Sequence, residues 1–349
     1  MRVKLEDVCE RGSSNLKQSD VAEMTGNYPI YGAAGYIGNV DFYHQENSYV
    51  AVVKDGAGIG RTTLHPAKSS VIGTMQYLLP KDNVLPEYLY YVVSYMHLEK
   101  YFTGATIPHI YFKDYKSEEF NLDSLEKQKE IVDALEKCEA VIESRKQELQ
   151  LLDELVKARF VEMFGNPVLN DKGWQQQSLG DITTKIGSGA TPKGGKGAYQ
   201  EEGITLIRSM NVHNGQFEYK DLAHISDEQA ARLDNVTIEE NDVLLNITGA
   251  SVARSCVVPA EVLPARVNQH VCIIRCKDCI IPEFLNKLLI DDNYQDLLWS
   301  IAGSGATREA ITKQQVERLQ IIMPPIELQN EFMSFCKQLD KSKFINISA

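Results

Sequence analysis

The second half of the chain repeats the first, and this internal repeat limits the possible fold more than any other feature of the sequence. The matching segments are LEDV at 5–8 with LGDI at 179–182, VKDGAGIGR at 53–61 with NITGASVAR at 246–254, LPEYL at 85–89 with IPEFL at 281–285, and GAT at 104–106 with GAT at 305–307. Because the matches keep the same order along the chain, they predict two modules of one fold.

Each half has the pattern of a mixed module. Short β-prone runs such as Tyr49–Val53 and Asp242–Ile247 come directly before glycine turns. The Pro-Glu pairs at 86–87 and 282–283 then open segments with apolar residues at helical spacing, and proline is well tolerated at the first position of a helix. The predicted class is therefore α+β, with two similar mixed α/β domains and a pseudo-twofold internal repeat.

A long helix is predicted between the halves. Asp123 and Glu126 form a capping-box pattern, and apolar residues then recur every seventh position at Leu135, Ile142, Leu149, Val156 and Met163. About 40 residues at a rise of 1.5 Å per residue make a helix roughly 60 Å long. We therefore predict a coiled-coil spacer helix over residues 123–165, between a first module at residues 1–122 and a second module at residues 166–323.

A second, shorter helix is predicted over residues 324–349, after Pro324-Pro325, packing antiparallel to the central one. It is about half as long as the central helix, so we expect apolar residues of the central helix to remain uncovered and to bind a partner. These candidate partner-binding residues are Leu149, Leu152, Val156 and Met163. The alternative is that they pack on the second module.

Composition limits the class of protein. No apolar run approaches the length that spans a bilayer, and the first residues lack the pattern of a signal peptide, so we expect a cytoplasmic protein with no membrane partner. The 7 scattered cysteines predict free thiols. The net charge of −12 disfavours a large basic surface, although residues 243–277 hold Arg254, Arg266, Arg275 and Lys277 against one acid and could form a local basic face. Ordinary solvated side chains are the alternative.

No catalytic or metal-site motif is complete. The glycine-rich stretch at 189–197 lacks the spacing and the hydroxyl residue of a phosphate-binding loop, and Arg61 replaces a glycine that a dinucleotide fingerprint needs. His270, Cys272, Cys276 and Cys279 could offer zinc ligands, but the alternation of a strand puts Cys272 and Cys276 on the side of Ile274, which favours buried thiols. We expect neither enzymatic activity nor a metal.

Two similar modules on a rigid spacer suit a reader of a split DNA site, because the spacer then fixes the distance between half-sites. A protein-interaction scaffold without DNA specificity or a tandem carbohydrate-binding protein could use the same plan. A set of short strings favours DNA reading: LGDI at 179–182, GSGATP at 187–192, RSMNV at 208–212, DVLL at 242–245, NQH at 268–270, GATR at 305–308, GATIPHI at 104–110 and LEKQ at 125–128. Through these strings the sequence resembles the specificity subunits of type I restriction-modification systems over nearly its whole length.

The resemblance implies a non-catalytic subunit whose two target recognition domains read a bipartite site in double-stranded DNA. It further implies docking of two methyltransferase subunits and, through them, restriction subunits. S-adenosylmethionine, ATP and magnesium would then belong to those partners, and this chain would bind no cofactor. The short distal helix departs from the common family layout, and a dimer of this chain could compensate for it.

Residues that flank the repeated turns are the candidate DNA contacts. Arg61 and Arg254 occupy equivalent places, and an arginine can read guanine or clamp a phosphate. Lys54, Lys185 and Lys193 are candidate phosphate contacts. Asn246, Asn268 and Gln269 could read adenine, although Asn268 and Gln269 could instead satisfy buried backbone groups. Arg308 could contact DNA or brace its turn.

Overall fold

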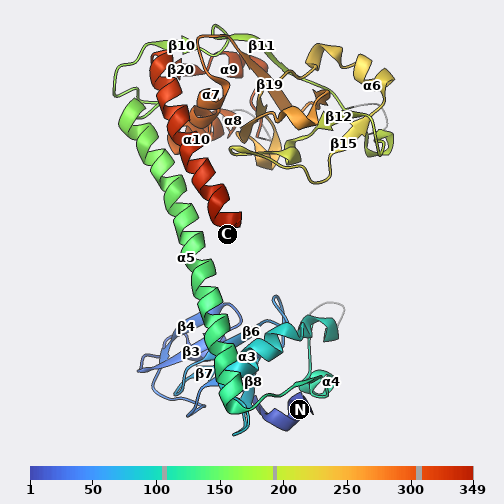
Figure 1. The fold of residues 1–349 in the computed structure, drawn as a ribbon, viewed down its shortest axis with the longest axis vertical. Coiled ribbons are helices and arrows are strands. Elements are labelled where there is room, and N and C mark those ends of the chain that lie inside the picture. Colours follow the sequence, from blue (N-terminus) through green and yellow to red (C-terminus); the bar gives the residue numbers. More distant parts are fainter. Residues whose placement is uncertain (104–107, 192–194, 304–308, 349) are drawn as a thin grey trace. The chain divides into compact units, whose positions relative to one another are not determined.

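The computed structural model describes residues 1–103, 108–191, 195–303 and 309–348. The chain divides into two compact units, residues 1–144 and 145–349, which are called unit 1 and unit 2 below. Helix α5 (Leu125–Phe164) begins in unit 1 and ends in unit 2 (Figure 1). Its bounds lie within the helix predicted at 123–165. No helix within the described ranges is both long and apolar enough to cross a membrane.

Unit 1 combines short helices with three small sheets. Its elements are β1 (Arg2–Lys4), α1 (Leu5–Val8), β2 (Cys9–Ser13), α2 (Gln18–Val21), β3 (Tyr28–Gly32), β4 (Gly35–Val40), β5 (Tyr49–Val53), β6 (Thr62–His65), β7 (Ser70–Val71), β8 (Met75–Pro80), α3 (Pro86–Tyr95), a 3-10 turn at Leu98–Tyr101, α4 (Phe112–Tyr115), β9 (Glu119–Asn121) and the start of α5. The sheets have the strand orders β2-β8-β5-β6, β4-β3-β7 and β1-β9.

Unit 2 repeats these sheets in the same arrangement. After α5 come β10 (Gln176–Ser178), β11 (Thr183–Ser188), β12 (Ile204–Ile207), β13 (Val212–His213), β14 (Gln216–Phe217), β15 (Ala223–Ile225), α6 (Asp227–Ala231), β16 (Val243–Asn246), β17 (Ser255–Val257), β18 (Ala265–Val267), β19 (Val271–Cys276), α7 (Pro282–Leu289), α8 (Asp292–Gly303), α9 (Lys313–Glu317), β20 (Gln320–Ile322) and α10 (Ile326–Ser348), with short 3-10 turns between them. The orders β11-β19-β16-β17, β15-β12-β18 and β10-β20 correspond to those of unit 1 strand by strand.

The register of the strands confirms the repeat predicted from the sequence. In unit 1 the Val53 N–H donates to the Arg61 carbonyl at 2.9 Å, and in unit 2 the Asn246 N–H donates to the Arg254 carbonyl at 2.8 Å. Both turns pass through a left-handed residue just before the arginine, Gly60 with φ +82° and Ala253 with φ +72°. The two arginines therefore hold equivalent places in three dimensions as well as in sequence.

Each unit also fixes its long helix with one buried glutamine. Gln128 at the start of α5 accepts from the Leu85 N–H at 2.9 Å, and its amide donates to the carbonyls of Asn83 and Asp123. In unit 2, Gln329 at the start of α10 accepts from the Ile281 N–H at 2.9 Å and donates to the carbonyls of Cys279 and Pro324. Both glutamines are fully buried, so each ties the first turn of a helix to the loop before α3 or α7.

Replacing Gln329 with leucine is expected to lower the free energy of unfolding by about 1–2 kcal/mol. The Ile281 N–H would lose its partner while remaining partly buried, and an unpaired donor away from water is more costly than a lost surface hydrogen bond. Chemical denaturation followed by circular dichroism measures the change. The adjacent exposed Asn330, replaced with leucine in the same way, should shift stability by much less; equal losses would contradict the role given to Gln329.

Within unit 2, α10 lies antiparallel to the C-terminal part of α5 (Figure 1). Arg159 forms an ion pair with Glu331 at 2.9 Å, and Asp153 pairs with Lys343 at 2.5 Å. The aromatic rings of Phe160, Phe164, Phe284 and Phe332 meet where these helices contact α7. The predicted antiparallel pair is therefore confirmed for this part of α5.

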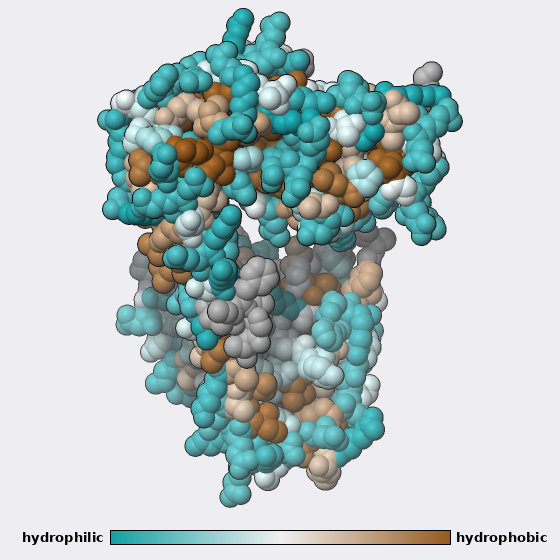
Figure 2. Space-filling view, turned by 45° about the horizontal axis from the view of Figure 1, so that its top comes forward, coloured by the Kyte–Doolittle hydropathy of each residue, from teal (hydrophilic) through white to brown (hydrophobic). Residues whose placement is uncertain are grey.

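The structure corrects part of the predicted partner-binding stripe. Val156 is 8% exposed within the core of unit 2, and Met163 packs against that core, so their own unit covers both side chains. Leu149 and Leu152 are half-buried and remain predicted partner contacts. Leu151 and Leu155, which the heptad pattern did not select, are 63% and 46% exposed. On the face drawn in Figure 2, hydrophobic side chains form separate groups among hydrophilic ones.

Candidate nucleic-acid interface

A groove of about 470 Å³ lies beside the turn between β16 and β17 in unit 2. It is lined by Ser209, Met210, Thr248, Gly249, Ala250, Ser251, Arg254 and His270. Arg254 is half-buried, and its guanidinium has no hydrogen-bond or ion-pair partner among the described residues. An arginine held at a groove without a partner is available to bind an outside ligand.

The other side chains that line this groove include hydroxyls, an imidazole and an apolar methionine. Thr248 and His270 form a hydrogen bond between the threonine hydroxyl and the imidazole Nδ1. Met210, which follows β12 and also lines the groove, is 42% exposed. A guanidinium, hydroxyls, an imidazole and an apolar side chain together match the donors, acceptors and methyl groups that base edges present in the major groove.

The equivalent turn of unit 1 is more charged. Arg61 is exposed, and its guanidinium donates to the carbonyl of Ala33, which follows β3. Lys54 lies 3.8 Å from the Asp55 carboxylate, and Asp55 in turn contacts the His109 Nδ1 at 2.6 Å. In both units the predicted arginine therefore lies beside the loop that follows the central strand of the three-stranded sheet, β3 or β12.

Two predicted base-reading residues are buried and serve the backbone instead. Asn246 is fully buried and donates its amide to the Ser209 carbonyl at 2.9 Å. Asn268 is 5% exposed, and its side-chain oxygen accepts from the His270 N–H at 3.0 Å. In the structure neither side chain is exposed for contact with DNA, and both instead hold the loops that carry the groove. Gln269 is exposed, accepts from the Thr191 hydroxyl and remains a candidate.

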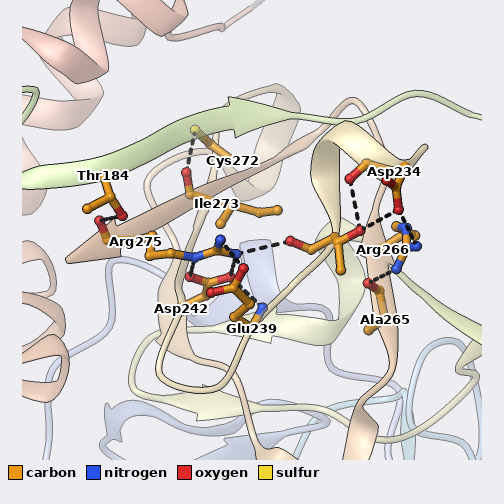
Figure 3. A network of polar contacts seen from close by, with 10 residues as sticks. Thr184, Asp234, Glu239, Asp242, Ala265, Arg266, Cys272, Ile273 and Arg275 are labelled. Carbon is orange, nitrogen blue, oxygen red and sulfur yellow. Dashed lines mark hydrogen bonds and ion pairs between the residues drawn. The ribbon is translucent and has the colours of Figure 1, made fainter. Parts of the chain in front are cut away.

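Most of the basic face expected over residues 243–277 does not form, because Arg266 and Arg275 are paired inside unit 2 (Figure 3). The Arg275 guanidinium donates to both carboxylate oxygens of the buried Asp242 at 2.8 Å, which raises the pKa of Arg275. Arg266 is 9% exposed and pairs with Asp234 at 3.2 Å. Of these arginines, only Arg254 keeps its guanidinium for an outside ligand.

The remaining predicted DNA contacts have mixed outcomes. Lys185 is half-buried on β11 and has no ion-pair partner in the described part of the chain, so it remains a candidate. Lys193 and Arg308 lie outside the described residues. Ser209, Met210 and His270 were not predicted as DNA contacts, although the strings at 208–212 and 268–270 contain them. The pairing of β12 with β18 and of β16 with β19 brings these residues close to Arg254.

The cysteines of β19 are core residues, as the strand alternation predicted. Cys272 lies in the same hydrophobic cluster as Ile274, and Cys276 packs against that cluster. Burial raises the pKa of the Cys272 thiol to about 12, which opposes the thiolate form that binds zinc. Within the described ranges, no group of three or more His, Cys, Asp or Glu side chains is placed to hold a metal ion.

The repeat seen in the structure also appears in comparison with known families. A family model of the type I restriction modification DNA specificity domain matches residues 1–154 and again residues 171–348. The chain belongs to this family. The first match covers the first repeated module, and the second match covers the second module.

Individual relatives agree with this assignment. The specificity subunit of the type I restriction enzyme MjaIX from Methanocaldococcus jannaschii is 26% identical over 292 residues, 77% of this chain and 65% of the relative. The MjaVIII specificity subunit of the same organism is 21% identical over 321 residues, 87% of this chain and 75% of the relative. The S subunit of a type I restriction-modification system from M. genitalium shares the fold, with a TM-score of 0.64 at 13% identity over 100% of this chain and 91% of that one.

Proposed function

We propose that this member of the specificity family selects the DNA site of a type I restriction-modification complex and that each unit reads one part of a bipartite sequence. The observation that supports this most strongly is the repeated turn. Arg61 and Arg254 follow the same hydrogen-bonded turn in two units of one topology, each beside the loop after β3 or β12. Two equivalent arginines in two similar units suit two half-sites of one duplex.

The chemistry of the complex would belong to its partners. We propose that two methyltransferase subunits dock on this chain and supply S-adenosylmethionine, and that restriction subunits, where they join, supply ATP and magnesium. This chain would contribute no catalytic residue. The exposed and half-buried leucines of α5, Leu149 and Leu152 among them, are the proposed docking contacts.

Co-expression with a candidate methyltransferase from a neighbouring gene tests the proposal. We expect a complex that methylates adenines within one split motif of the host DNA, mapped by single-molecule sequencing, and we expect the motif to disappear when this chain is left out. A methyltransferase that forms no complex with this chain and methylates the same sites without it would overturn the proposal. That result would favour a scaffold without DNA specificity.

A further inference from the structure

Unit 1 has a groove of about 250 Å³ beside its glycine turn. It is lined by Arg11, Ser13, Lys54, Asp55, Gln76, Ile110, Tyr111, Phe112 and Lys113. Three of these side chains are cations and one is a carboxylate. Lys54 and Asp55 belong both to this groove and to the turn that leads to Arg61, so the groove continues the candidate nucleic-acid interface.

The charges of this groove favour an anion. Arg11 is exposed, and its guanidinium donates to the Ser13 hydroxyl at 3.3 Å. The Lys113 ammonium lies 5.4 Å from the centre of the Tyr111 ring. Neither cation forms an ion pair with any residue that the structure describes. The one carboxylate, Asp55, is already engaged by His109 at 2.6 Å and by Lys54 at 3.8 Å.

The repeat shows that these cations are specific to unit 1. Arg11 lies opposite Leu78 in the β2–β8 pair, and its counterpart Ile186 lies opposite Ile274 in the β11–β19 pair. The Lys54 carbonyl accepts from the Ile110 N–H, as the Ile247 carbonyl accepts from Ile311. The three cations Arg11, Lys54 and Lys113 thus correspond to Ile186, Ile247 and Gln314.

In unit 2 two of these positions are apolar and the third is neutral. Ile186 and Ile247 belong to the hydrophobic core of that unit, together with Cys272, the counterpart of Gln76, whereas Gln314 is exposed. The neighbouring Lys313 is neutralised by Glu317 at 3.5 Å. Two of the three cationic positions of the unit 1 groove are therefore core positions in unit 2, and the third carries a neutral, exposed side chain.

We propose that this groove binds the DNA phosphodiester backbone through Arg11, Lys54 and Lys113, and that their counterparts Ile186, Ile247 and Gln314 in unit 2 do not. Phosphate contacts position a protein on the duplex and carry no base information, so unit 1 would supply most of the salt-sensitive affinity. In a chain of net charge −12, the three cations give this groove a local positive charge that would attract a polyanion. The hydroxyls of Ser13 and Tyr111 are further donors for phosphate oxygens. The proposal rests on the proposed function in that the polyanion is DNA.

The test is the salt dependence of DNA binding by the full-length chain carrying both Arg11→Gln and Lys113→Gln. Binding to a labelled duplex is followed by fluorescence anisotropy from 50 to 300 mM NaCl, with each phosphate contact expected to contribute about 0.9 to the slope of log K against log salt. We expect the slope to fall by about two in magnitude. The control, Lys127→Gln with Lys129→Gln, removes the same charge from exposed positions of α5 in the same unit and should leave the slope unchanged.

The outcomes separate this proposal from the one on which it rests. A wild-type chain that binds DNA with a slope identical to that of the groove variant would overturn the groove proposal and leave the proposed function standing. A wild-type chain that binds no duplex, alone or with its methyltransferase, would overturn both. Unchanged DNA binding with loss of the methyltransferase complex would show that the groove takes an acidic protein surface, which also contradicts the proposal.

Discussion

Replacing Phe332 with alanine is expected to lower the free energy of unfolding by about 3–5 kcal/mol. The ring is fully buried on α10, with centroid distances of 5.6 Å to Phe160, 5.5 Å to Phe164 and 6.4 Å to Phe284. Its loss would leave a cavity where α5, α7 and α10 meet, and the surrounding rings could close it only in part. Chemical denaturation of the full chain measures the change.

The same helix offers a control for this prediction. Phe335 is half-buried, and its ring is covered on one side by the Arg159 guanidinium at 5.9 Å. Phe335→Ala should cost much less, since part of the ring already faces water. If Phe332→Ala proved no more destabilising than Phe335→Ala, α10 would not be held by this aromatic cluster, and the pairing of α10 with α5 would need another cause.

The sequence alone was sufficient to predict the repeated turns of the two modules and the long helix between the modules. The repeated turns and the heptad spacing are local patterns, and local patterns determine hairpins and long helices. They predicted the equivalent turns that end at Arg61 and Arg254 and a helix that matches α5. The burial of Val156 and Met163 could not be predicted in the same way, because they pack with residues such as Phe284 and Phe332, which lie far away in the chain.

The candidate site was predicted less completely. Asn246 and Asn268 are polar residues beside a turn, and the sequence alone does not tell whether such an amide faces solvent or the backbone of another loop. For Asn246 the answer depends on the Ser209 carbonyl, which belongs to a loop of the neighbouring sheet. Likewise Arg254 and Arg275 look alike in sequence, and only the fold places Asp242 beside Arg275.

Replacing Arg254 with alanine is expected to weaken binding to the cognate duplex about 10- to 100-fold and to relax specificity in one half-site. The guanidinium lies at the groove of unit 2 without a partner among the described residues, so its removal takes a contact from DNA and leaves no internal group unpaired. A bidentate arginine contact contributes about 1–3 kcal/mol of discrimination between bases. Anisotropy with cognate and single-substituted duplexes measures affinity, and methylation mapping measures specificity.

Three variants show which contact is lost. Arg254→Lys keeps the charge without the planar fork, so it should recover affinity better than base discrimination. Arg232→Ala removes an exposed arginine that pairs with Glu228 on α6, and it should change neither. Arg275→Ala should instead destabilise the fold, because it leaves the buried Asp242 carboxylate without its cation. If Arg254→Ala bound and methylated as the wild type does, the repeated turn would not be the reading element, and the main structural support for a DNA-reading role would be lost.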